Sequence, residues 1–105
     1  MPAPSKEIQT PVPTGAEHRV VVDGDVDLTT TAHLGRILDE AIARSPATVV
    51  VDLTDAGFVG CRGAELLLRS HGALEADGRR MSIRGAHPGL RRSLAICGLG
   101  ELLDS

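Results

Sequence analysis

Aromatic side chains are almost absent from this chain of 105 residues. It contains no tryptophan or tyrosine and a single phenylalanine, Phe58. Stacking of aromatic rings on nucleic-acid bases is therefore nearly excluded. An excess of positive charge is also missing, because 11 basic and 14 acidic residues give a net charge of −3. This balance argues against electrostatic binding of nucleic acid, and we expect no nucleic-acid partner.

Long apolar runs are missing as well. No run approaches the ~20 residues that a membrane-spanning helix needs. The N-terminal stretch MPAPSKEIQT lacks the apolar core of a signal peptide. We therefore expect a cytoplasmic protein without membrane contact. The chain has only two cysteines, Cys61 and Cys97. In a reducing cytosol such residues are more often free thiols than a disulfide.

The length is sufficient for one domain with a real core. Hydrophobic residues make up 42% of the chain. A domain of this size hides roughly two-thirds of its unfolded surface, and the scarcity of aromatics means that its core must be aliphatic. Four of the six prolines lie within residues 1–16. We interpret 1–16 as a flexible N-terminal arm or edge strand, and 17–105 as the folded domain.

Apolar residues recur with the periods of strands and helices in turn. The segments that carry them are a strand in 18–22, a helix in 29–46, a strand in 48–53, a helix in 63–78, a strand in 79–85 and a helix in 87–100. The first helix has one apolar stripe, formed by Leu34, Ile37, Leu38, Ala41 and Ile42. Alternation of strands and helices predicts an α/β domain with a largely parallel sheet.

Local signals add detail to these elements. The valine run at 20–22 predicts a first strand buried on both faces. Thr29 or Thr30 is expected to cap the first helix, and Gly78 to end the second in a left-handed conformation. In the last helix, Pro88 fits the first turn and Gly98 ends the helix. The C-terminal segment ELLDS is expected to dock on the core.

No group of residues has the spacing of a metal site. The two cysteines form no CxxC pair. Asp23, Asp25 and Asp27 resemble the opening of a calcium loop, but no acidic residue follows at the twelfth position. The histidines are scattered, and we interpret all four as surface residues: His18, His33, His71 and His87. We therefore expect no bound metal.

Neither nucleotide binding nor cysteine catalysis is supported at GFVGCRG (57–63). The segment lacks the Walker Lys-Ser/Thr pair and the Rossmann spacing, so its glycines indicate a tight strand-to-helix turn. Cys61 lies near a helix start beside Arg62, but no histidine can be placed next to it. We interpret Cys61 as a small buried thiol and Cys97 as a core residue. No catalytic residue and no cofactor are expected, and the chain is not predicted to be an enzyme.

The remaining functional signal lies at the start of the second helix. Free N–H groups and the helix dipole favour anions there. The apolar stretch 57–59 lies next to it, and an exposed apolar patch suits a protein partner.

Three segments together resemble STAS domains, the fold of anti-sigma factor antagonists. VVVDGDVDLTTTAHL is similar to the family's opening, G-E-L-D…T/A…L. VVVDLTDAGFVGCRGAELLL is similar to its DLS…F-hydrophobic-D-S-S/T-G…LL segment. The stretch EADGRRMSIRGAHPGLRRSLAICGLGELL is similar to its closing P-V-R-R-L-L…G-L…L pattern. The resemblance covers roughly residues 17–104.

The resemblance implies a single STAS-like domain with a mixed, mostly parallel sheet of about four or five strands flanked by helices. It also implies partner switching in bacterial transcription. Such proteins bind an anti-sigma factor, often a serine kinase with a histidine-kinase-like ATP fold, and thereby free the sigma factor. Phosphorylation of the Ser or Thr before the motif glycine ends binding, because phosphate adds charge at the interface. A weak homodimer is a further possibility.

The sequence departs from the family pattern at the phosphorylation motif. Gly63 matches the motif glycine, so Arg62 takes the phosphoacceptor position, Cys61 the preceding serine and Gly60 the motif aspartate. Arginine cannot accept phosphate from such a kinase, and no phosphorylation is expected at this position. The resemblance places the partner-binding surface at Asp25, Asp27, Thr29, Phe58, Gly60, Cys61, Arg62 and Gly63.

Three interpretations remain open. The first is an antagonist that binds its anti-sigma factor and is not released by phosphorylation. The second is a divergent STAS module that binds another regulator or a small anion through Arg62 and the helix N-terminus. The third is a redox sensor in which Cys61 responds.

Overall fold

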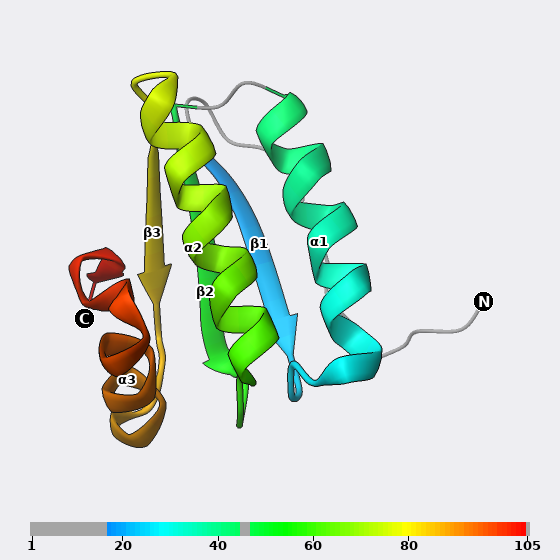
Figure 1. Cartoon of the computed structure of the whole chain (residues 1–105), viewed down its shortest axis with the longest axis vertical. Helices are drawn as coiled ribbons and strands as arrows, with labels where there is room; N and C mark the ends of the chain where they lie inside the picture. Colours follow the sequence, from blue (N-terminus) through cyan, green and yellow to red (C-terminus); the bar gives the residue numbers. More distant parts are fainter. Residues whose placement is uncertain (1–16, 45–46, 105) are drawn as a thin grey trace.

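Strands and helices alternate along the computed structural model, which describes residues 17–44 and 47–104 (Figure 1). In chain order the elements are β1 (Glu17–Asp23), α1 (Leu28–Ala43), β2 (Thr48–Asp55), α2 (Cys61–Ala76), β3 (Arg80–Arg84), α3 (Pro88–Leu94), the kinked turn η1 (Ala95–Leu99), the 3-10 turn η2 (Gly100–Leu102) and β4 (Leu103–Asp104). The predicted α/β domain is confirmed. The arm or edge strand expected at 1–16 lies outside the described residues.

The strands form one sheet in the order β1-β2-β3-β4. Every strand pair within the described residues is parallel, and β4 adds only two residues beside β3. Right-handed crossovers between consecutive neighbours place their helices on one face of a sheet, and α1 and α2 lie side by side on the same face (Figure 1). The carboxyl ends of β1 and β2 therefore meet at one edge, where α1 and α2 begin.

The core is aliphatic, as the composition requires. The predicted stripe of α1 is confirmed, with Leu34, Leu38 and Ala41 fully buried and two isoleucines packed partly against the core. The inward alternation of β3 buries Met81 and Ile83. Further buried core residues come from β2, α2, α3 and η2: Val49, Val51, Leu53, Leu67, Leu74, Leu90, Leu94 and Leu102. The C-terminal segment thus docks on the core as expected.

β1 differs from its prediction in two ways. Val20 and Val22 are buried, whereas Arg19 is exposed and Val21 only half-buried, so the strand alternates and is not buried on both faces. His18, expected at the surface, is fully buried, and neither of its ring nitrogens has a hydrogen-bond partner. Burial, followed by the charge of Arg44, lowers the pKa of His18. The alternation of the strand places this residue on the core side, which its residue type alone does not reveal.

The C-terminal helix also differs from its prediction. Leu90 and Leu94 are buried, but Cys97 is exposed, so the expected core position is wrong. The helical path continues past Leu94 only as far as Gly98, where the chain turns, so Leu99 is buried and Cys97 stays on the outer side. Gly98 has φ of 93° and ends the turn, as predicted.

The helices of the described residues are too short and too polar for a membrane span: within 17–44 and 47–104 no candidate is found.

Candidate partner-binding surface

Two loops lie side by side at the carboxyl edge of the sheet. One, 24–27, joins β1 to α1, and the other, 56–60, joins β2 to α2. The Val26 N–H donates to the carbonyl oxygen of Phe58 at 2.8 Å, and the Gly60 N–H donates to that of Val26 at 2.9 Å. Val26 and Val59 thereby form an isolated parallel bridge. The sheet is in effect extended into the loops, so the starts of α1 and α2 are held together.

Asp27 caps α1, in place of the expected Thr29 or Thr30. Its carboxylate accepts from the backbone N–H groups of Thr29 at 2.9 Å and Thr30 at 3.2 Å. The Thr30 hydroxyl oxygen in turn accepts from the Asp27 N–H at 2.9 Å, which completes a capping box. The Thr29 hydroxyl, followed by these two N–H groups, lowers the pKa of Asp27. The charged carboxylate of Asp27 is therefore held in place at the start of α1.

The start of α2 presents the Cys-Arg pair to solvent. Gly60 is the N-cap in extended conformation and provides no side-chain cap. Cys61 is exposed, so the expected burial of this thiol is wrong: it is the first helical residue and lies on the outer side of the turn. Gly63 is buried instead. A Cβ atom there would lie 2.8 Å from Val26 Cγ1 and 3.1 Å from Val59 Cγ1. Gly63 thus allows α2 to pack closely on the bridge.

A hollow of about 240 Å³ opens between the starts of α1 and α2. We call it the Leu28 hollow; its lining is Asp27, Leu28, Thr31, Phe58, Gly60, Cys61 and Arg62. Leu28 is 78% exposed and Phe58 55% exposed. Large apolar side chains with this exposure are candidates for contact with a partner.

A second hollow, of about 260 Å³, lies on the other side of Phe58, between the start of α2 and the end of α3. We call it the Cys97 hollow; its lining is Phe58, Val59, Gly60, Cys61, Ser93, Ile96 and Cys97. Ile96 is 81% exposed. The sequence analysis did not predict that Ile96 and Leu28 are exposed at this surface. Both lie outside the apolar stripes of their helices, and that position was the sequence signal for their exposure.

His87 connects the 56–60 loop to α3. Its Nδ1 accepts from the Leu90 N–H at 3.2 Å and thereby caps α3. Its Nε2 lies 3.0 Å from the Gly57 carbonyl oxygen, to which it donates in the tautomer that this cap requires. His87 thus positions the loop that carries Phe58. A histidine directly before a first-turn proline was the only sequence signal for this role.

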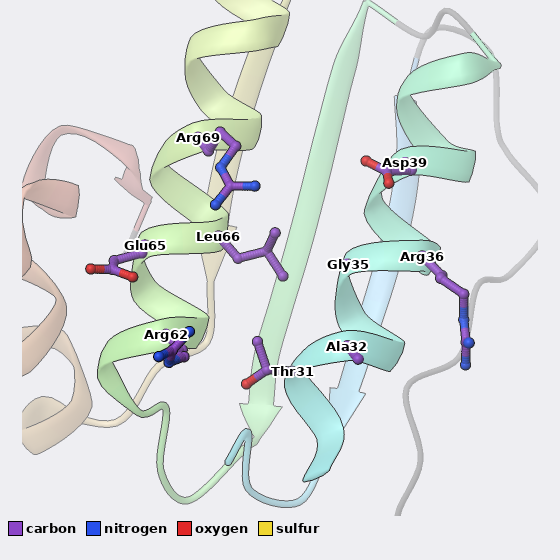
Figure 2. Close-up of a pocket in the computed structure, with 9 residues that line it drawn as sticks. All are labelled: Thr31, Ala32, Gly35, Arg36, Asp39, Arg62, Glu65, Leu66 and Arg69. Carbon is purple, nitrogen blue, oxygen red and sulfur yellow. The ribbon is translucent and has the colours of Figure 1, made fainter. Parts of the chain in front are cut away.

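A third hollow, of about 350 Å³, lies between α1 and α2 (Figure 2). We call it the α1–α2 groove. Arg69 extends from α2 toward the groove, and Asp39 of α1 points toward α2 (Figure 2). Arg36 also lines the groove but is turned away from α2 (Figure 2). Arg62 lines both this groove and the Leu28 hollow, so the exposed arginine links the polar and apolar parts of this surface.

The family of the chain follows from its match to a sequence model. A family model described as "Mlab, STAS domain" matches residues 11–104. The chain belongs to the STAS domain family. No curated protein sequence gives a significant match to it.

Solved structures similar to this chain include two that are described as anti-sigma factor antagonists. The anti-sigma factor antagonist SpoIIAA in its unphosphorylated form has 20% identity and a TM-score of 0.81, covering 92% of this chain and 85% of the other. An anti-sigma factor antagonist from Mycobacterium paratuberculosis has 26% identity and a TM-score of 0.79, covering 98% and 87%. RsbS from Moorella thermoacetica has 16% identity and a TM-score of 0.71, covering 88% and 78%.

The residues predicted to bind a partner fall into three groups in this STAS domain: those that line the Leu28 hollow, those exposed near it, and one that is buried. Those that line the Leu28 hollow are Asp27, Phe58, Gly60, Cys61 and Arg62. Asp25 and Thr29 are exposed close by, but they line none of the three hollows. Gly63 is buried beneath this surface. The parallel pairing of β1 and β2 is what brings residues more than 30 positions apart in the sequence together.

Proposed function

We propose that this STAS domain binds an anti-sigma factor of the serine-kinase type and so acts as an anti-sigma factor antagonist. The contact surface consists of the Leu28 hollow and the neighbouring Phe58. One observation carries the proposal: the two exposed apolar side chains, Leu28 and Phe58, flank an exposed Arg62 at the uncapped start of α2. A protein surface of this kind, with an aromatic anchor and a charged neighbour, suits association with another protein.

Arginine at position 62 makes this binding independent of the usual release signal. The resemblance to the family motif puts Arg62 where a phosphorylated hydroxyl would stand, and the guanidinium cannot accept a phosphoryl group. Its charge is also opposite to that of a phosphate, which carries about −1.5 to −2 at neutral pH. We therefore expect a complex that persists in the presence of ATP.

Phe58→Ala is expected to weaken binding of the anti-sigma kinase by at least about 10-fold, because an aromatic anchor at an interface commonly contributes about 2 kcal/mol. The measurement is a titration of purified kinase from the same cell, with and without ATP. Leu68→Ala is the matched control: Leu68 is 41% exposed on α2 and lines neither hollow around Phe58. Equal affinities for the two variants, or release of the native chain by ATP, would argue against the proposal.

The α1–α2 groove supports a second candidate function, the binding of a small anion. Within the described residues, Arg62 and Arg69 take part in no ion pair, although both line this groove. Arginine is well suited to bind phosphate, because its planar fork donates two parallel hydrogen bonds.

This candidate predicts that inorganic phosphate raises the thermal unfolding midpoint of the native chain, because a ligand that binds only the folded state stabilises it. The double variant Arg62→Ala with Arg69→Ala should lose that shift. Arg19→Ala serves as the control for removal of a surface arginine, since Arg19 pairs with Asp52 at 2.9 Å and lines none of the three hollows. If phosphate raised the unfolding midpoint by the same amount in all three proteins, anion binding in the α1–α2 groove would be ruled out.

A further inference from the structure

The fold brings the chain's only two cysteines to one place. Cys61 begins α2 and Cys97 lies in η1, 36 positions later in the sequence. Both are free and exposed, and both line the Cys97 hollow. Thiols that share one solvent-open hollow are accessible to small oxidants and to one another.

The segment that carries Cys97 is locally irregular. Gly98 within η1 has φ of 93°, so the helical path breaks at this residue, directly after Cys97. A disulfide needs Cα atoms about 4.4–6.8 Å apart. α2 and η1 pack against each other, and the last residues before a helix-ending glycine can adjust more readily than the regular helix before them. The exposed Ile96 beside Cys97 shows that this turn is not held by core packing on that side.

We propose that Cys61 and Cys97 form a reversible intramolecular disulfide across the Cys97 hollow. The oxidant is hydrogen peroxide. One cysteine, as thiolate, attacks a peroxide oxygen, the O–O bond breaks, and a sulfenic acid and one water form. The thiolate of the other cysteine then attacks the sulfenic sulfur, the S–S bond forms, and a second water leaves. Two thiols and one peroxide thus give one disulfide and two waters, and a small dithiol reductant reverses the reaction by exchange.

The consequence for binding rests on the proposed function. Phe58 lines both the Cys97 hollow and the Leu28 hollow, so a bridge beneath it ties the start of α2 to η1 and alters the surface on which a partner would bind. Oxidation would then supply a covalent off-signal at the site where phosphorylation is missing.

The disulfide is tested on the full reduced chain without any partner. Treatment of dilute protein with hydrogen peroxide should lower the intact mass by two hydrogen atoms. Trypsin should then release the fragment 45–62 joined to the fragment 93–105, and reduction should separate them. The link should form faster in buffer than in urea, because the fold holds the thiols together. Cys61→Ser and Cys97→Ser should each abolish the link and leave a single oxidisable thiol.

Two results would overturn the disulfide: a link that forms equally fast in urea, or oxidation that yields only dimers and sulfenic or sulfinic acids. The regulatory consequence has a separate readout, the affinity for the anti-sigma kinase. Reduced chain should bind, and oxidised chain should bind at least about 10-fold more weakly, a change of about 1.4 kcal/mol. The affinity of Cys61→Ser, which has no thiol in the Leu28 hollow and forms no link, should be the same before and after peroxide treatment. If the link forms but affinity is unchanged, the regulatory role is wrong. If reduced chain does not bind at all, the proposed function fails and the disulfide stands.

Discussion

A chain with Gly60→Asp and Arg62→Ser is expected to accept phosphate at position 62 from a kinase that binds the native chain without modifying it. The double substitution introduces the aspartate and the hydroxyl that the proposed alignment to the family motif puts at these positions. The phosphorylated fraction should rise from none of the native chain to most of the double variant. It should also release the kinase, since the phosphate adds about −1.5 to −2 charge on the contact surface.

The structure has room for both substitutions. Gly60 has ordinary negative φ, and a Cβ atom there would meet Phe58 Cε2 at 3.4 Å and the Val26 carbonyl oxygen at 3.5 Å. An aspartate at this N-cap can also accept from free N–H groups of the first turn, which stabilises a helix by a few tenths of a kcal/mol relative to glycine. Position 62 is exposed, so serine replaces arginine without loss of core packing.

Intact-mass and fragment-mass measurements after incubation with kinase and ATP provide the test. The control is Gly60→Asp with Arg62→Ala, which has the same N-cap but no hydroxyl at position 62 and should remain unmodified. Phosphate on the control, or none on the double variant despite demonstrated binding of the kinase, would contradict the assignment of Arg62 to the phosphoacceptor position.

Gly63→Ala is expected to destabilise the domain, although alanine is the better helix former. The added Cβ would lie 2.8 Å from Val26 Cγ1, and Val26 is buried and β-branched, so it cannot turn away easily. Overpacking of this kind costs about 1–3 kcal/mol, more than the roughly 1 kcal/mol that the change gains in helix propensity. The variant should therefore unfold at lower denaturant concentration, and α2 should shift away from the Val26–Val59 bridge.

Gly72→Ala on the same helix is the matched control. Nothing lies within 4 Å of the Cβ position of Gly72, which is exposed, so only the propensity gain of up to about 1 kcal/mol remains. The two substitutions should change the free energy of unfolding in opposite directions. Equal stabilities would show that α2 does not depend on close approach at Gly63. Weaker kinase binding by Gly63→Ala alone would link this packing to the proposed contact surface.

The prediction from sequence was strongest for elements whose residues interact locally. The stripe of α1 and the inward alternation of β3 depend on helix and strand periods, which are visible within a few residues. The left-handed glycine after α2, Gly78 with φ of 74°, was predictable because few other residues adopt that conformation. The errors occurred where burial depends on packing against distant parts of the chain, as at His18, or on the path of the chain at a helix end, as at Cys97.

The sequence by itself determined the alternating elements and the aliphatic core, because composition and local periodicity are properties of the chain alone. Only the tertiary structure decided which residues meet. The parallel pairing of β1 and β2 joins Val26 to Val59 and so creates the Leu28 hollow between two helix starts. The end of the last helix at Gly98 leaves Cys97 exposed, in the same hollow as Cys61. Contacts across long sequence separations depend on strand register and helix packing, which no local pattern specifies.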